Sequence, residues 1–194
     1  MNAWFGNALV LAGIVAIIVI RAPHGRRSAK TKIADSRKGR LEIGLLTLMW
    51  VTMIVLPVVS IASPLLSFAD YPLHPISFSI GAASLFAGLY LLYRSHADLG
   101  RNWSVSLEIR EGHMLVTSGI YERIRHPMYT AIFLQAIAQA LLLPNWVAGP
   151  SCLLAFFTMF MLRVNLEERM MLEKFGDAYV LYMKRTKRLI PCVW

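Results

Sequence analysis

Residues 146–162 read WVAGPSCLLAFFTMFML, a run of seventeen residues without an Asp, Glu, Lys or Arg. A helix needs roughly 17–25 apolar residues to cross a bilayer, so this run is just long enough. Four further runs lack these charged residues: 3–20, 43–66, 77–93 and 129–143. The chain is 57% hydrophobic and 16% charged, whereas soluble domains are about 45–50% apolar and about 25% charged. We therefore expect an all-α integral membrane protein with about five transmembrane helices.

The basic residues are confined to three segments. Residues 21–40 hold eight of the 20 Lys and Arg, residues 94–125 hold five and residues 163–188 hold seven, whereas the connections 64–76 and 144–145 hold none. With five spans, the three basic segments lie on one side of the membrane, and such segments are normally cytoplasmic. This predicts a multi-pass protein of the inner or plasma membrane, with its N-terminus outside and its C-terminus in the cytoplasm. The net charge of +9 then points to anionic lipid headgroups as partner, not to nucleic acid.

Two polar segments, 94–128 and 163–194, form most of the predicted cytoplasmic part. Loops longer than about 12–15 residues are usually functional or disordered, and residues 94–128 are too rich in Trp, Tyr, Ile, Leu and Val for disorder. Together the two segments are too small for an independent catalytic domain. We expect one domain, 1–194, whose site is built jointly by both segments and the inner ends of the helices.

Arg163 follows directly on the last apolar run, and Glu167 lies four residues later on the same helical face. The two can form an ordinary ion pair where the helix leaves the bilayer. An ionisable group at that depth is also a functional candidate, and an arginine can hold a carboxylate through two parallel hydrogen bonds. Glu167 can hold a cationic or hydroxylated ligand. Both interpretations stay open.

His126 and Pro127 precede the fourth predicted span. Proline is tolerated in the first turn of a helix, so the pair can simply mark a helix start. The same N-terminus offers free N–H groups to a ligand carboxylate or hydroxyl. Upstream, GHMLVTSGIY at 112–121 predicts either a packed turn and strand or a backbone cradle for a nucleoside, with Tyr121 or Tyr129 against the base.

Several familiar motifs are absent from the chain. It contains no G-x-G-x-x-G, G-x-x-x-x-G-K, H-E-x-x-H or C-x-x-C, so Rossmann, P-loop and common zinc sites are unsupported. The five histidines are scattered, without a carboxylate at ligand spacing. We therefore expect no metal.

The second half of the chain carries a series of motifs, namely HMLV at 113–116, GIY at 119–121, RHPMY at 125–129, Arg163 with Glu167 and Glu168, and FGDAY at 175–179 with Tyr182. This series resembles the isoprenylcysteine carboxyl methyltransferase family, integral membrane enzymes that use S-adenosylmethionine. The resemblance is strongest over residues 98–190, and the length and five-span plan resemble the short prokaryotic members. Phospholipid N-methyltransferases share the R-H-P-x-Y and E-E patterns.

The resemblance implies roles for individual residues. The positions that match donor-binding residues of the family are His113, Met114, Leu115, Val116, Tyr121, His126, Pro127, Met128, Tyr129 and Glu167. Arg163 matches the arginine assigned to the substrate carboxylate, so Arg163 and Glu167 are the implied catalytic pair. Asn102 and Trp103 match a motif that lines the substrate side. The eukaryotic members place a glutamine seven residues before the cradle histidine, where this chain has Ser106.

The function these residues favour is S-adenosylmethionine-dependent methylation of a lipophilic acceptor at the membrane interface, with S-adenosylhomocysteine as product. Its sharpest form is O-methylation of a prenylcysteine-type carboxylate, an acceptor that needs no general base. One alternative is N-methylation of an amino lipid or small amine. A second alternative is a non-catalytic membrane scaffold or transporter, which would bind no methyl donor.

Overall fold

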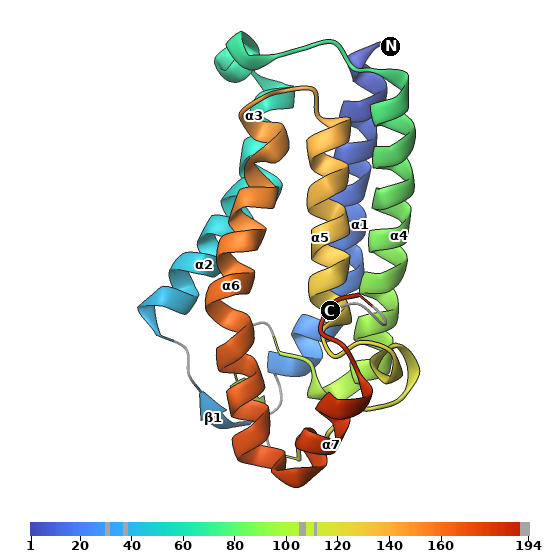
Figure 1. Ribbon diagram of the computed structural model, residues 1–194. Helices are drawn as coiled ribbons and strands as arrows, with labels where there is room; N and C mark the ends of the chain where they lie inside the picture. The colour runs from blue at the N-terminus through green and yellow to red at the C-terminus, as the bar shows by residue number, and fades with distance from the viewer. Residues whose placement is uncertain (30–31, 37–38, 105–107, 111, 191–194) are drawn as a thin grey trace.

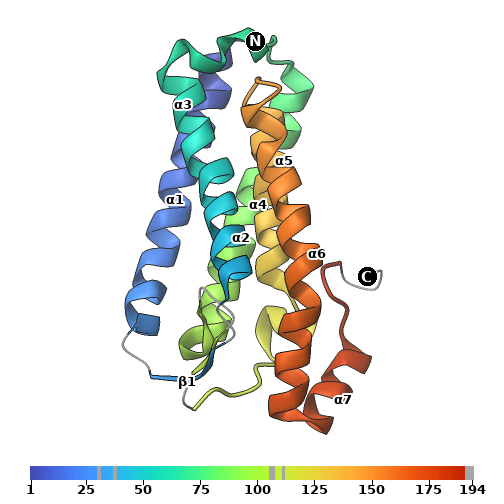
Figure 2. The ribbon, with the colours of Figure 1, turned by 90° about the vertical axis from the view of Figure 1, so that its left-hand side faces the viewer.

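The computed structural model describes residues 1–29, 32–36, 39–104, 108–110 and 112–190. Its helices run nearly side by side between two ends (Figures 1 and 2). The α-helices are α1 (Ala3–Ala29), α2 (Arg40–Trp50), α3 (Leu56–Ala62), α4 (Pro75–Leu99), α5 (Pro127–Leu142), α6 (Ala148–Phe175) and α7 (Asp177–Arg185). The shorter elements are a π-helix η1 (Val51–Val55), 3-10 turns η2 (Pro64–Ala69), η3 (Gly100–Asn102) and η4 (Gly119–Glu122), and strands β1 (Ile33–Ser36) and β2 (Glu108–Arg110).

The expected all-α membrane fold is confirmed. Among the described residues, four continuous helical stretches are long and apolar enough to cross a membrane: Ala3–Ser28, Arg40–Ala62, Pro75–Leu99 and Ala148–Phe175. The fifth, Pro127–Leu142, is a shorter apolar helix of about 24 Å at 1.5 Å per residue. The 28 residues of α6 extend about 42 Å, more than the roughly 30 Å of a hydrocarbon core. Its C-terminal turns therefore carry Arg163 and Glu167 toward one end of the bundle.

Helix α5 is the centre of the packing, with α4 on one side and α6 on the other (Figure 1). Glycines allow α4 to approach closely, because a Cβ atom at Gly88 would lie 3.1 Å from the carbonyl oxygen of Ala131. Ser84 donates a hydrogen bond to the Leu134 carbonyl at 2.7 Å across the same interface. Gly81 and Gly88 thus serve packing within the chain, as small residues commonly do between membrane helices.

The second span contains a π-helical turn just before Pro57. The sequence predicts a kink at this proline, which lacks the N–H of a regular helix. The structure places η1 at Val51–Val55 and starts α3 immediately afterwards. π-turns are often found at functional sites, and Met53 and Ile54 of this segment line the cavity described below.

Two loops at the end opposite the N-terminus are joined by a small antiparallel sheet. Strand β1, from the basic segment after α1, pairs with β2, from the long loop after α4. In the sequence, the apolar residues Val105, Leu107 and Ile109 alternate with polar ones, a pattern that predicts a strand. Residues 105–107 lie outside the described residues, and β2 covers Glu108–Arg110. The pairing connects the basic segment to the loop that carries most of the predicted site.

Candidate active site

A cavity of about 660 Å³ lies at this end of the bundle. All thirteen residues that the sequence singles out line it: Asn102, Trp103, His113, Met114, Leu115, Val116, Tyr121, His126, Pro127, Met128, Tyr129, Arg163 and Glu167. The remaining wall includes side chains of α1 and α2, and Met170, Tyr179 and Tyr182 from the C-terminal part. The volume falls in the range of about 300–1,000 Å³ typical of small-molecule sites.

The loop after α4 is held in place by polar contacts to α4 and η3. The Asn102 side-chain oxygen accepts the Met114 backbone N–H at 2.9 Å, which makes Asn102 an anchor of the loop as well as part of the wall. Asp98 accepts the Ile120 N–H at 2.8 Å. Gly119, at φ +64°, leaves room for that carboxylate, because any Cβ there would overlap it. These contacts hold the loop against the bundle, with 113–116 at the cavity.

His113 presents an unsatisfied ring nitrogen beside this cavity. Its Nδ1 is buried and makes no hydrogen bond within the described structure, and its ring lies 5.9 Å from that of Phe175. Burial, together with the positive charge of Lys174, lowers the pKa of His113 below its usual 6.5. The imidazole is therefore neutral at pH 7 and can exchange a hydrogen bond with a ligand.

The N-terminus of α5 is joined to the segment that follows α7. The backbone N–H groups of Arg125 and His126 donate to the carbonyls of Lys187 and Arg188 at 2.7 and 3.0 Å. Thr130 donates to the Leu189 carbonyl at 2.9 Å. Residues 187–189 thus cover the start of α5, and the loop and the C-terminal segment form one unit, as the sequence predicts.

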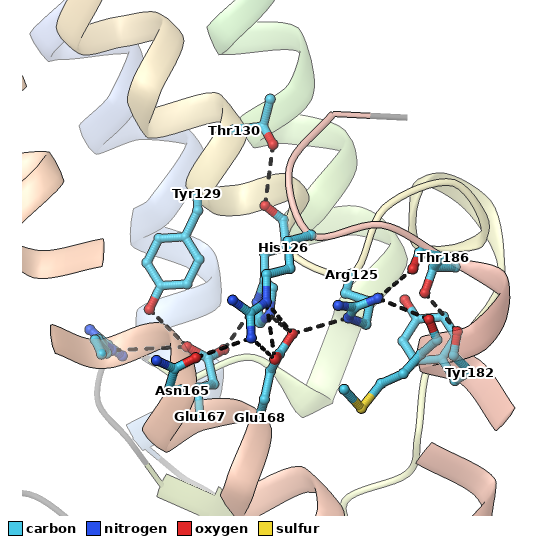
Figure 3. A network of polar contacts seen from close by, with 12 residues as sticks. Arg125, His126, Tyr129, Thr130, Asn165, Glu167, Glu168, Tyr182 and Thr186 are labelled. Atoms are coloured by element: carbon cyan, nitrogen blue, oxygen red, sulfur yellow. Dashed lines mark hydrogen bonds and ion pairs between the residues drawn. The ribbon is translucent and has the colours of Figure 1, made fainter. Parts of the chain in front are cut away.

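Glu168 organises a buried charge network at this junction (Figure 3). Its carboxylate accepts from Arg125 Nε at 3.0 Å, contacts His126 Nε2 at 3.2 Å and pairs with Arg188 Nη2 at 2.6 Å. Arg125 also donates to the carbonyls of Met183 and Thr186. Because breaking a buried ion network leaves charges without compensation, Glu168 is a structural residue that sets the position of His126.

Glu167, its neighbour, faces the cavity instead. The Tyr129 hydroxyl donates to its Oε2 at 2.8 Å, and His126 Nδ1 lies 4.0 Å from its Oε1. The Glu167 side chain keeps 36% of its surface exposed, whereas Glu168 keeps 5%. Adjacent carboxylates therefore have different surroundings: Glu168 is enclosed by protein cations, and Glu167 can accept a ligand.

Arg163 has a nearer partner than the sequence suggests. Its Nε is 4.0 Å from Glu167 Oε2, but its Nη1 is 3.2 Å from Glu42 Oε1. Glu42 belongs to the first turn of α2 and is only 4% exposed. Sequence reasoning missed Glu42, although it is an isolated acidic residue at the start of an apolar run.

Two further contacts at the cavity could not be predicted from the spacing of residues in the sequence. Arg21 of α1 lines the cavity, with its guanidinium carbon 5.6 Å from the centroid of the Trp103 ring. Tyr182 donates to the Tyr121 carbonyl at 2.6 Å, and burial raises the pKa of both tyrosines, so both phenols stay protonated.

Ser106 lies outside the described residues. Within the described part of the chain, no three His, Cys, Asp or Glu side chains gather as a metal site.

Known proteins resemble this chain in sequence and in fold. The sequence profile of the isoprenylcysteine carboxyl methyltransferase family matches residues 80–173. A protein-S-isoprenylcysteine O-methyltransferase of Schizosaccharomyces pombe is 33% identical over 111 residues, which cover 56% of this chain and 47% of that protein. The human protein of the same name is 35% identical over 92 residues, covering 47% of this chain and 32% of that one.

The solved structure of the eukaryotic intramembrane Ras methyltransferase of this family is also similar. It aligns with a TM-score of 0.54 and 26% identity, over 80% of this chain and 54% of that chain. The chain thus resembles the isoprenylcysteine carboxyl methyltransferase family in sequence over residues 80–173 and in fold. It spans about half the length, or less, of the two relatives named above. All thirteen predicted site residues fall inside the region that the family profile matches, whereas Arg21 and Glu42 fall outside it.

Proposed function

We propose that this protein transfers a methyl group from S-adenosylmethionine to a lipophilic acceptor at the membrane interface, with a prenylcysteine-type carboxylate as the acceptor. The observation that carries the proposal is the cavity shared by the loop after α4, the C-terminal segment and the apolar faces of α1 and α2. A polar donor and an apolar acceptor can meet in such a space. The resemblance to the isoprenylcysteine carboxyl methyltransferase family supports the same reaction class.

The donor end is assigned to the loop and to the start of α5. The residues we propose to hold it are His113–Val116, Tyr121, His126–Tyr129 and Glu167. They fit such a molecule because His113 offers a buried nitrogen that still needs a hydrogen-bond partner, and Glu167 offers a carboxylate oriented by Tyr129 for a cationic group. The donor supplies, when bound, an electrophilic methyl group on a positively charged sulfur.

The acceptor end is assigned to Arg163 and to the apolar wall formed by Ile17, Leu46, Met49, Trp50 and Met53. Burying a lipid tail contributes about 0.8 kcal/mol per CH₂, so the cavity can bind the acceptor mainly through the acceptor's apolar tail. A carboxylate is already nucleophilic, so the residues need only orient it and exclude water. Asn102 and Trp103 would shape the adjoining wall.

The membrane orientation is part of the proposal. The three basic segments reach the same end of the bundle as the cavity (Figure 2), and Lys- and Arg-rich loops normally stay in the cytoplasm. We therefore place the N-terminus outside the cell and the cavity on the cytoplasmic side of the inner or plasma membrane. There a water-soluble donor enters from the cytoplasm and the acceptor enters from the bilayer.

Two measurements on the purified protein in detergent test the function. Calorimetric titration with S-adenosylhomocysteine should give micromolar affinity; absence of binding would favour a scaffold or transporter. Incubation with labelled S-adenosylmethionine and a farnesylated cysteine analogue should then label the carboxylate. Labelling of ethanolamine lipids with a steep rise at alkaline pH would instead identify an N-methyltransferase, which must remove a proton from its acceptor. No labelling of either acceptor, or of a lipid extract, would refute the proposal.

A further inference from the structure

We infer that Arg21 is a second cationic residue of the acceptor site, and that it, together with Arg163, selects acceptors with an anionic head. This inference rests on the proposed function, because it specifies which acceptors the same cavity takes. Arg21 lies near the end of α1 and lines the cavity.

The surroundings of Arg163 show why one arginine is not enough. Glu42 lies 3.2 Å from its guanidinium, and Glu167 lies 4.0 Å away. A carboxylate that arrives at Arg163 therefore meets two negative side chains for a single positive one. Like charges at such distances repel strongly when water is scarce, so anion binding here needs another cation.

Arg21 supplies that cation. Among the side chains that the structure describes, no carboxylate lies within 4.0 Å of its guanidinium. Arg21 and Arg163 both line this cavity, and two positive charges that share a space with little water repel each other. An anion placed between them relieves that repulsion and is held by donors from two helices.

Trp103 keeps Arg21 directed at the cavity. The guanidinium lies over the indole at 5.6 Å, within the usual range for a cation–π contact. The indole is itself held, being 2% exposed, with Nε1 3.3 Å from Met128 Sδ and its ring 4.9 Å from that of His96. An arginine that served only to orient α1 would extend toward lipid headgroups, and this one stacks on a buried ring instead.

The neighbours of Arg21 indicate an amphiphilic ligand. Ile17 and Ile18, about one turn earlier on α1, line the same cavity, and Ile18 is 51% exposed. Arg21 is about 27 Å along the helix from Ala3, close to the far edge of a hydrocarbon layer of roughly 30 Å. A ligand whose apolar tail lies in the bilayer beside α1 would therefore have its head group near Arg21.

The test compares a farnesylated cysteine acid with its methyl ester, which has the same tail and no charge. Both are titrated calorimetrically into the protein in zwitterionic nanodiscs with saturating S-adenosylhomocysteine. The wild type should prefer the acid at least about tenfold, the size expected for a charge-assisted hydrogen bond. Arg21→Gln should bring this ratio close to one without changing the affinity for S-adenosylhomocysteine. Arg26→Gln, which removes an exposed charge from the same helix, should keep the ratio.

Arg21→Met serves as a second neutral variant in case Arg21→Gln fails to fold, because methionine suits an apolar helix. An unchanged ratio in whichever of these variants folds, or no preference for the acid in the wild type, would overturn the inference. It would also be overturned if added phosphatidylglycerol displaced the acid from the wild type through Arg21, since the residue would then hold a lipid headgroup. The ratio is a binding measurement, so it stands apart from turnover: a protein that prefers the acid but never methylates it refutes the proposed function alone.

Discussion

Tyr129 of α5 and Glu167 of α6 form a hydrogen bond with their oxygens 2.8 Å apart, at the point where the two helices border the cavity. The bond joins two motifs that are 38 residues apart in the sequence. The Glu167 side chain is 36% exposed, and its Oε2 also lies 4.0 Å from Arg163 Nε. Substitutions at Tyr129, Glu168, Arg163 and His113 should separate the effects of these contacts on donor binding, acceptor use and stability.

Tyr129→Phe should weaken donor binding while leaving stability nearly intact. The variant loses a hydrogen bond to a charged group, an effect of about 1.5–3 kcal/mol, but Glu167 can recover water because it is 36% exposed. We expect the Kd for S-adenosylhomocysteine to rise about tenfold and the thermal midpoint to stay within a few degrees. Tyr90→Phe, on an exposed tyrosine of α4, is the matched control; equal affinities in both variants would contradict the role given to Tyr129.

Glu168→Gln should act on stability first. The variant leaves Arg125 and His126 without their buried anion, and loss of one partner of a fully buried pair costs about 3–5 kcal/mol. We expect about 2–3 kcal/mol, because Arg188 is 27% exposed and can be solvated. The thermal midpoint should fall, and trypsin should cleave faster at Lys184–Arg188. Glu122→Gln, at an exposed site, should change neither; a similar result for Glu168→Gln would show that the network is dispensable.

Arg163 and Glu42 should behave as a coupled pair. Arg163→Gln alone leaves Glu42 charged and 4% exposed, so we expect a marked fall in the thermal midpoint. Adding Glu42→Gln should restore most of it, because the buried charge is gone. The KM for the farnesylated acceptor should stay raised about tenfold or more in both variants. Recovery of acceptor use in the double variant would mean that Arg163 only compensates Glu42.

His113 should make stability depend on pH. Burial and Lys174 lower its pKa in the folded protein, so below pH 6.5 the unfolded chain binds the proton first. Stability then decreases as the pH falls from about 6.5 toward the lowered pKa. Thermal midpoints between pH 7.5 and 5.5 should fall less steeply for His113→Asn than for the wild type. His74→Asn, at an exposed position at the other end of the bundle, should follow the wild type; parallel curves for all three proteins would exclude this effect.

The membrane fold and the thirteen residues lining the cavity could be read from local patterns. Charge-free runs of helical length need no tertiary information, because the bilayer itself requires helices of that length. The motifs around His113, His126 and Glu167 are likewise short enough to be found in one stretch. Their assignment to a cavity followed from resemblance, since spacing alone left the ordinary structural interpretations open.

The tertiary structure alone decided which charges meet. Arg21, Glu42 and Arg163 come from three different helices, and no sequence separation shows that α1 and α2 turn these side chains toward α6. Glu167 and Glu168 are adjacent and chemically identical, yet one faces the cavity and the other is enclosed by Arg125 and Arg188. The physical reason is that local sequence determines the length and polarity of a membrane helix, whereas its rotation and its neighbours depend on packing against all the other helices at once.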